Sequence, residues 1–178
     1  MCLMLKPQDI LVALKILVNG WPRTYAELGN DIGMSADGAH TAVQRAVRAG
    51  LVNREGQWAN KQAIAEFLIH GLKYVFPTQP GAITRGMPTS YAVAPLAGEI
   101  SHKEEDIPVW PDPEGTVRGW TLVPLCRSVP IAASKDPELY SWLALADALR
   151  CSRAREREAA VRVIKKRLPP CAATLSTQ

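Results

Sequence analysis

The chain has 178 residues, of which 47% are hydrophobic and 21% are charged, a balance typical of a globular protein with one core or two small units sharing one. Its formal net charge of +4 permits nucleic-acid binding but does not by itself indicate it. The longest apolar runs are too short for a bilayer and no signal peptide opens the chain, so we expect a cytoplasmic protein with no membrane partner.

No residue pattern in the chain indicates catalysis, a cofactor or a metal. The cysteines have neither CxxC pairing nor a histidine at ligand spacing, so we expect free thiols. Glu104, Glu105 and Asp106 are consecutive, and adjacent side chains diverge, so we interpret them as a solvated loop. Phosphate loops, nucleophile elbows and HExxH motifs are also missing from the sequence, so we expect a protein that is not an enzyme.

The first predicted element is a helix over residues 6–18. Pro7 suits its first helical position, and Gly20 and Pro22 end it. Apolar residues recur on one face at three- and four-residue steps, and these are Ile10, Leu11, Leu14, Leu17 and Val18.

Two more helices are predicted next, separated by a tight turn. Thr24 is expected to cap the first of them, which runs to about Ile32, and Gly33 is the residue type expected just past a helix end. Ser35 is a good N-cap for the next helix, which is predicted over residues 36–49.

The helix over residues 36–49 has an apolar stripe and a polar side. The stripe consists of Ala39, Val43, Ala46 and Val47. The other side carries Asp37, His40, Thr41, Gln44, Arg45 and Arg48. The segments "LVNR" and "QWAN" then predict a small hairpin with Trp58 packed beneath it, and a further helix runs from Asn60 to about Tyr74.

This order of elements is that of a winged helix-turn-helix, in which the helix after the turn can enter the DNA major groove. The stretch "TYAELGNDIGMSADGAHTAVQRAVRAGLVNR" resembles "SYAELxxxLGLSxxxVHxALxRLxxAGLV", the pattern of winged helix-turn-helix regulators of the MarR-like group, and the resemblance covers residues 6–75. It implies a repressor-like transcriptional regulator that binds double-stranded DNA sequence-specifically, as a homodimer on paired half-sites.

Two sets of DNA-contacting residues follow from position. The predicted base-reading residues are Asp37, His40, Thr41 and Gln44. The predicted phosphate contacts are Thr24, Tyr25, Ser35, Arg45, Arg48 and Arg54. The wing "NREGQ" is short, and its one arginine is followed by Glu55, so strong minor-groove reading by the wing is not expected.

The amino-acid composition changes from residue 77 onward. Residues 77–134 are rich in Pro and Gly and predict an irregular region, with two short strands in "IPVWPDPEGTVRGWTLVPL" and with Trp110 and Trp120 closing a small second core. Residues 135–168 predict two helices, the first opened by Asp136 and Pro137. Residues 169–178 are expected to be a disordered tail.

The predicted fold class is mainly α with small β: a winged helix-turn-helix over residues 1–76, then a smaller irregular α/β region ending in two helices. The basic helix in "RCSRAREREAAVRVIKKRL" has three interpretations: a solvated amphipathic helix, a contact to the DNA backbone, or one half of a dimer interface over Leu139–Leu168. The alternative function is that of a protein-interaction module, such as an antitoxin or defence-system component that binds a protein partner through residues 77–168.

Overall fold

The computed structural model describes residues 4–55, 57–98, 107–151 and 153–169. The described chain is mainly helical with small β elements, as predicted. The predicted tail, apart from Pro169, the acidic segment at 104–106, Cys2 and Cys171 lie outside the described residues. None of the helices in the described part combines the length and apolar character that a membrane crossing requires.

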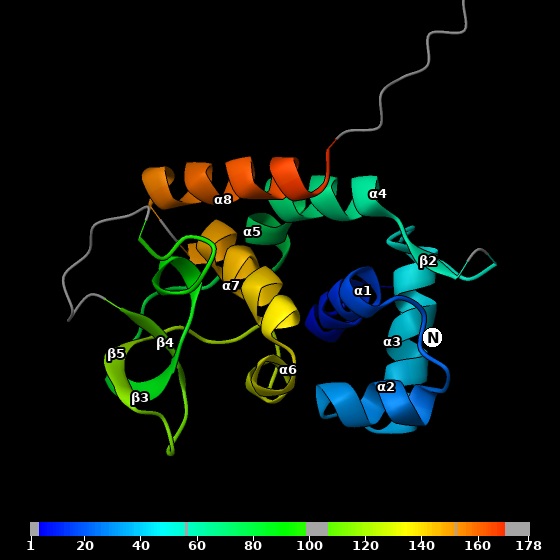
Figure 1. The fold of residues 1–178 in the computed structure, drawn as a ribbon, viewed down its shortest axis with the longest axis horizontal. Helices are drawn as coiled ribbons and strands as arrows, with labels where there is room; N and C mark the ends of the chain where they lie inside the picture. Colours follow the sequence, from blue (N-terminus) through cyan, green and yellow to red (C-terminus); the bar gives the residue numbers. More distant parts are fainter. Residues whose placement is uncertain (1–3, 56, 99–106, 152, 170–178) are drawn as a thin grey trace, which may run out of the picture.

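The N-terminal elements follow the predicted order (Figure 1). These are α1 (Pro7–Asn19), α2 (Tyr25–Ile32), α3 (Ala36–Arg48), β1 (Val52–Asn53), β2 (Trp58–Ala59) and α4 (Lys61–Glu66). β1 and β2 form an antiparallel pair, with Val52 opposite Ala59. The expectation that Trp58 packs under the hairpin is wrong, because its side chain is 48% exposed on a strand of only two residues.

The helix predicted to run from Asn60 to Tyr74 is interrupted. After α4 the chain makes a π-helical turn, Phe67–Gly71, before α5 (Leu72–Val75). The Leu72 amide donates to the Phe67 carbonyl across this wider turn. Gly71 allows the Phe67 ring to lie against the backbone, because a Cβ at Gly71 would be only 3.0 Å from that ring.

Residues 83–121 form a small closed barrel of three strands. β3 (Ile83–Pro88) pairs antiparallel with both β4 (Pro108–Pro111) and β5 (Val117–Thr121), and β4 and β5 meet in parallel. The sequence predicts two strands here but misses β3. The barrel strands need glycine at two positions, because a Cβ at Gly86 would collide with the Trp110 carbonyl and a Cβ at Gly119 with the Ile107 carbonyl.

Three helices complete the fold, after a short 3₁₀ turn, Ser90–Ala92, that follows β3. They are α6 (Val129–Lys135), α7 (Pro137–Cys151) and α8 (Ala154–Arg167). The predicted cap of α7 is confirmed, because the Asp136 carboxylate accepts the Leu139 amide at 3.0 Å. α6 lies within the region predicted to be irregular, and the sequence misses it.

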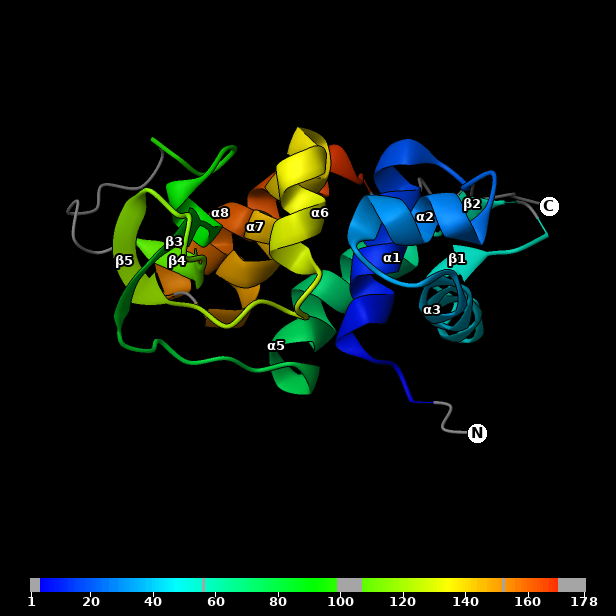
Figure 2. The same cartoon turned by 90° about the horizontal axis from the view of Figure 1, so that it is seen from below.

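α7 is the central helix of the molecule (Figures 1 and 2). It contacts α1, α5, α6, α8 and the 3₁₀ turn, and every residue from Ser141 to Arg150 is buried. The N-terminal elements and the second half therefore share one hydrophobic core. Most apolar side chains of α7 and α8, including Leu143 and Ile164, are buried within the chain itself, which disfavours the dimer-interface interpretation of Leu139–Leu168, and dimerisation stays a prediction.

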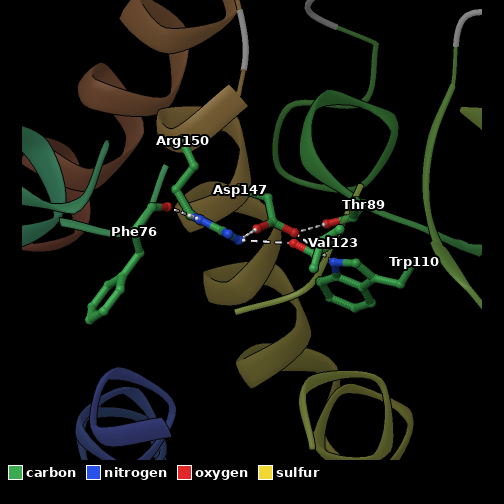
Figure 3. Close-up of polar contacts among 6 residues, drawn as sticks. All are labelled: Phe76, Thr89, Trp110, Val123, Asp147 and Arg150. Carbon is green, nitrogen blue, oxygen red and sulfur yellow. Dashed lines mark hydrogen bonds and ion pairs between the residues drawn. The ribbon is translucent and has the colours of Figure 1, made fainter. Parts of the chain in front are cut away.

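A buried polar network fixes the barrel to α7 (Figure 3). The Asp147 carboxylate accepts from Thr89 Oγ1 at 2.9 Å and Trp110 Nε1 at 2.6 Å, and it pairs with Arg150 at 2.7 Å. Arg150 in turn donates to the carbonyls of Phe76 at 2.8 Å and Val123 at 3.3 Å. One acid and one arginine thus join β4, the end of α5 and the segment after β5.

We predict that Asp147→Ala lowers the free energy of unfolding by about 3–5 kcal/mol, because it leaves the Arg150 guanidinium buried without its counter-charge. Urea denaturation followed by far-ultraviolet circular dichroism measures the loss. The matched control is Glu158→Ala on the exposed side of α8, which should change stability by less than about 0.5 kcal/mol. Equal effects of the two substitutions would contradict the assignment.

Candidate nucleic-acid interface

The turn between α2 and α3 is built from the local signals that the sequence carries. The Thr24 hydroxyl accepts the Glu27 amide at 3.1 Å and begins α2. Gly33 ends α2 in the left-handed conformation, with φ of 68°. The Ser35 hydroxyl then accepts the Gly38 amide at 3.1 Å and begins α3. The predicted capping roles of Thr24 and Ser35 are confirmed.

Gly29 makes the turn tight. Its carbonyl accepts the Met34 amide at 2.7 Å. A Cβ at Gly29 would lie 2.6 Å from the Met34 carbonyl oxygen, so a larger residue would push the two helices apart. The angle at which α3 leaves the turn therefore depends on the absence of a side chain at this position.

The inner face of α3 consists of small side chains. Ala39, Ala42 and Ala46 are fully buried, and α3 packs against α1, α2 and β1. Short side chains let the helix backbone lie close to its neighbours. The opposite face of α3 is not covered by α6, α7, α8 or the barrel, which lie on the far side of α1 and α2 (Figure 2).

Arg45 requires a correction, because the sequence places it among the phosphate contacts. Its side chain is only 8% exposed, and its Nε and Nη2 donate to the two oxygens of Asp9 at 2.8 and 2.6 Å. Asp9 is fully buried and also accepts the Lys6 amide at 2.8 Å. Arg45 lies at the edge of the alanine face, so its long side chain reaches α1 rather than solvent. An acid, Asp9, directly before the apolar run "ILVAL" was the available signal.

All four predicted base-reading residues lie on the outer face of α3. Asp37 and Thr41 are exposed, whereas His40 and Gln44 are half-buried. The Nε2 atoms of Gln44 and His40 are 3.1 Å apart, and the His40 ring lies 4.6 Å from the Tyr25 ring between centroids. These contacts order the polar groups before any ligand arrives.

Four of the predicted residues converge on one hollow between α2, α3 and the hairpin. It has a volume of about 170 Å³ and is lined by Tyr25, Val43, Gln44, Val47, Arg48 and Arg54. Arg48 and Arg54 are exposed, and neither has a hydrogen-bond or ion-pair partner within the described residues. The hollow therefore presents two available guanidinium groups and a phenol beside the amide of Gln44.

The second half of the chain supports the turn from behind. Ser128, immediately before α6, donates its hydroxyl to the Gly33 carbonyl at 3.1 Å, and Lys135 donates to the Asn30 carbonyl at 2.6 Å. Ile131 of α6 packs on Gly33, where a Cβ would lie 2.9 Å from its side chain. No local pattern in the sequence indicates these residues, because they lie 95 and 105 positions from the residues that they contact.

Lys15 of α1 links α2 to the start of α7. Its ammonium lies 3.3 Å from Asp31 and 3.1 Å from Asp136. Burial by itself raises the pKa of Asp136, but the Leu139 amide and Lys15 more than offset this and hold that pKa below its usual value.

Comparison with protein-family models, with curated proteins and with solved structures finds no match to this chain.

We predict that Arg45→Ala lowers the free energy of unfolding by about 3–5 kcal/mol, because the Asp9 carboxylate is left buried without its counter-charge. A paired replacement by apolar residues of similar volume, Asp9→Leu with Arg45→Met, should recover much of that loss. Urea denaturation of the single and double variants measures both values. An Arg45→Ala protein as stable as the wild type would contradict the buried ion pair.

A pH dependence follows from Asp136. Its folded pKa is depressed, so its charge stabilises the fold above the unfolded pKa near 3.8, and this contribution is lost as the pH falls through the folded value. Wild type should therefore be more stable than Asp136→Asn at pH 7, and the difference should shrink only as the pH falls below about 3.8. Thermal unfolding at a series of pH values tests this, and a difference that does not depend on pH would contradict it.

Proposed function

We propose that the N-terminal elements form a winged helix-turn-helix that binds double-stranded DNA sequence-specifically, with α3 in the major groove, and that the protein is a transcriptional regulator. The order of elements, the capped start of α3 and the resemblance to MarR-like regulators favour this function.

The observation that carries the proposal is the outer side of α3 with its hollow. A helix that enters the major groove needs one face packed on the protein and another exposed, with donors and acceptors for base edges. α3 has its alanines buried and Asp37, Thr41 and Arg48 exposed. The rest of the fold leaves this side open.

The residues divide naturally into two roles. Gln44 can form a bidentate pair with adenine, and Thr41 can contact a thymine methyl. Arg48 and Arg54, which line the hollow together with Tyr25, would contact backbone phosphates. Ser35 and Thr24 lie at helix N-termini, where backbone amides favour anions.

Removing Arg45 from the interface changes the expected electrostatics. Only Arg48 and Arg54 line the hollow as cations, and each neutralised phosphate contributes a slope of about −0.9 to the dependence of log K on log salt. We therefore expect a shallow salt dependence from this region, so specificity depends on base contacts. The outer side of α8 carries further basic residues, and a role for them in backbone contact stays a prediction.

A homodimer remains part of the proposal, because paired half-sites call for two copies of α3. Its interface would have to lie outside the apolar faces of α7 and α8, which the chain buries itself. Sedimentation equilibrium of the full chain measures the oligomeric state.

The test begins with selection of a preferred duplex by the full chain from a random library, followed by a mobility shift at two salt concentrations. We predict that Gln44→Ala weakens binding to the selected duplex by about 1–3 kcal/mol and leaves binding to random duplex nearly unchanged. Unaltered preference for the selected sequence would remove Gln44 from the base-reading role. Failure of the wild type to select any sequence would overturn the proposal.

Arg48→Ala should instead weaken binding to selected and random duplexes alike and reduce the salt slope by about one. The matched control is Arg118→Ala, which removes an equally exposed arginine from the barrel, at the opposite end of the molecule from α3 (Figure 2). That variant should bind both duplexes like the wild type. Equal losses in the two arginine variants would mean that binding reflects net charge and not the hollow.

A further inference from the structure

The barrel carries a second and larger hollow, distant from α3. It is an open groove of about 680 Å³ between β3, β5 and the turn that joins β4 to β5. Its lining includes Ile83, Arg85, Glu114, Gly115 and Arg118. The groove lies on the other side of α7 from the DNA-binding elements (Figures 1 and 2).

Two arginines stand side by side in the lining of this groove. Arg85 of β3 lies directly opposite Arg118 of β5 in the antiparallel register, so their side chains leave the same face of the sheet. Both are exposed, and neither guanidinium has a hydrogen-bond or ion-pair partner in the described part of the chain. Like charges at directly opposed positions destabilise a strand pair. An anion between them would remove that repulsion.

The base of the groove is rigid. Gly115 lies so close to β3 that a Cβ there would be 2.5 Å from the Gly86 Cα. β3 is bonded along its length to β4 and β5, and the barrel is fixed to α7 by the Asp147 network. The guanidinium groups therefore start from a fixed backbone, which reduces the entropy lost when they grip a ligand.

We propose that this groove binds an extended segment of a partner protein that presents a carboxylate next to an apolar side chain. A guanidinium matches a carboxylate with two parallel hydrogen bonds, and two guanidinium groups surround it. Ile83 is 55% exposed at the side of the groove and provides the apolar contact. The proposal does not depend on DNA binding by α3.

The lining favours a protein over a nucleic acid. Glu114 would repel a run of phosphates, whereas a protein segment can pair with both signs of charge. The lining also has no aromatic ring on which a base could stack, and the apolar surface there is aliphatic. Arginine beside an exposed aliphatic residue is typical of a protein interface.

Fluorescence anisotropy tests the proposal with a labelled nonapeptide that carries Glu-Leu-Asp between Gly-Ser flanks. The control peptide carries Gln-Leu-Asn in the same flanks. The full chain should bind the acidic peptide at least about tenfold more tightly than the control, because charge-assisted hydrogen bonds are lost in the amide version. Equal binding of the two peptides would overturn the proposal.

Variants locate the binding. The double variant Arg85→Ala with Arg118→Ala should lose the preference for the acidic peptide, and Arg48→Ala should keep it. Removing the opposed charges should leave the unfolding midpoint unchanged or raised, so a loss of binding cannot be attributed to unfolding. Retained preference in the double variant would overturn the assignment to this groove.

Charge reversal tests the role of the two arginines independently. Arg85→Glu with Arg118→Glu should abolish binding of the acidic peptide and create a preference for a Lys-Leu-Lys peptide in the same flanks. A mobility shift with random single-stranded and duplex DNA tests whether the groove binds nucleic acid instead. A loss of DNA binding in the double alanine variant as large as that in Arg48→Ala would assign the groove to nucleic acid and overturn the peptide proposal.

Discussion

One buried carboxylate, that of Asp147, determines how the second half of the chain is arranged. It accepts hydrogen bonds from Thr89, Trp110 and Arg150. Arg150 also donates to two backbone carbonyls. A buried ion requires such complete satisfaction, since an unpaired charge in the core costs several kcal/mol. The barrel, α5 and α7 are thereby held in one arrangement. Asp9 and Arg45 form a second buried ion pair, between α1 and α3.

A continuous series of contacts links these two networks. The barrel is bound to α7, α7 follows α6, and α6 contacts the turn from which α3 begins. The two proposed binding surfaces, the outer side of α3 and the groove of the barrel, lie on opposite sides of this helical core (Figure 2). The two proposed surfaces therefore do not overlap.

Local signals were sufficient for the first three helices. Pro7, Thr24, Gly33, Ser35 and Gly50 act through the backbone of their own neighbourhood, and the helix boundaries that they predict lie within a residue or two of those observed. The cap at Asp136 was predictable for the same reason. β3 and α6 were not, because a six-residue strand rich in Gly and Pro and a seven-residue helix have too short a pattern to stand out from a loop.

By itself, the sequence determined the helix-turn-helix order, the small residues of the inner face of α3 and the set of polar residues from which an outer face could be drawn, since each of these is a matter of spacing along one helix. Only the tertiary structure decided which polar residues remain outside. Arg45 turns inward because Asp9 lies on another helix. Residues 141–150 of α7 are buried because α1, α5, α6, α8 and the 3₁₀ turn surround them. Arg85 lies opposite Arg118 because β3 pairs with β5. Such outcomes depend on contacts between residues far apart in the chain, and no local pattern encodes them.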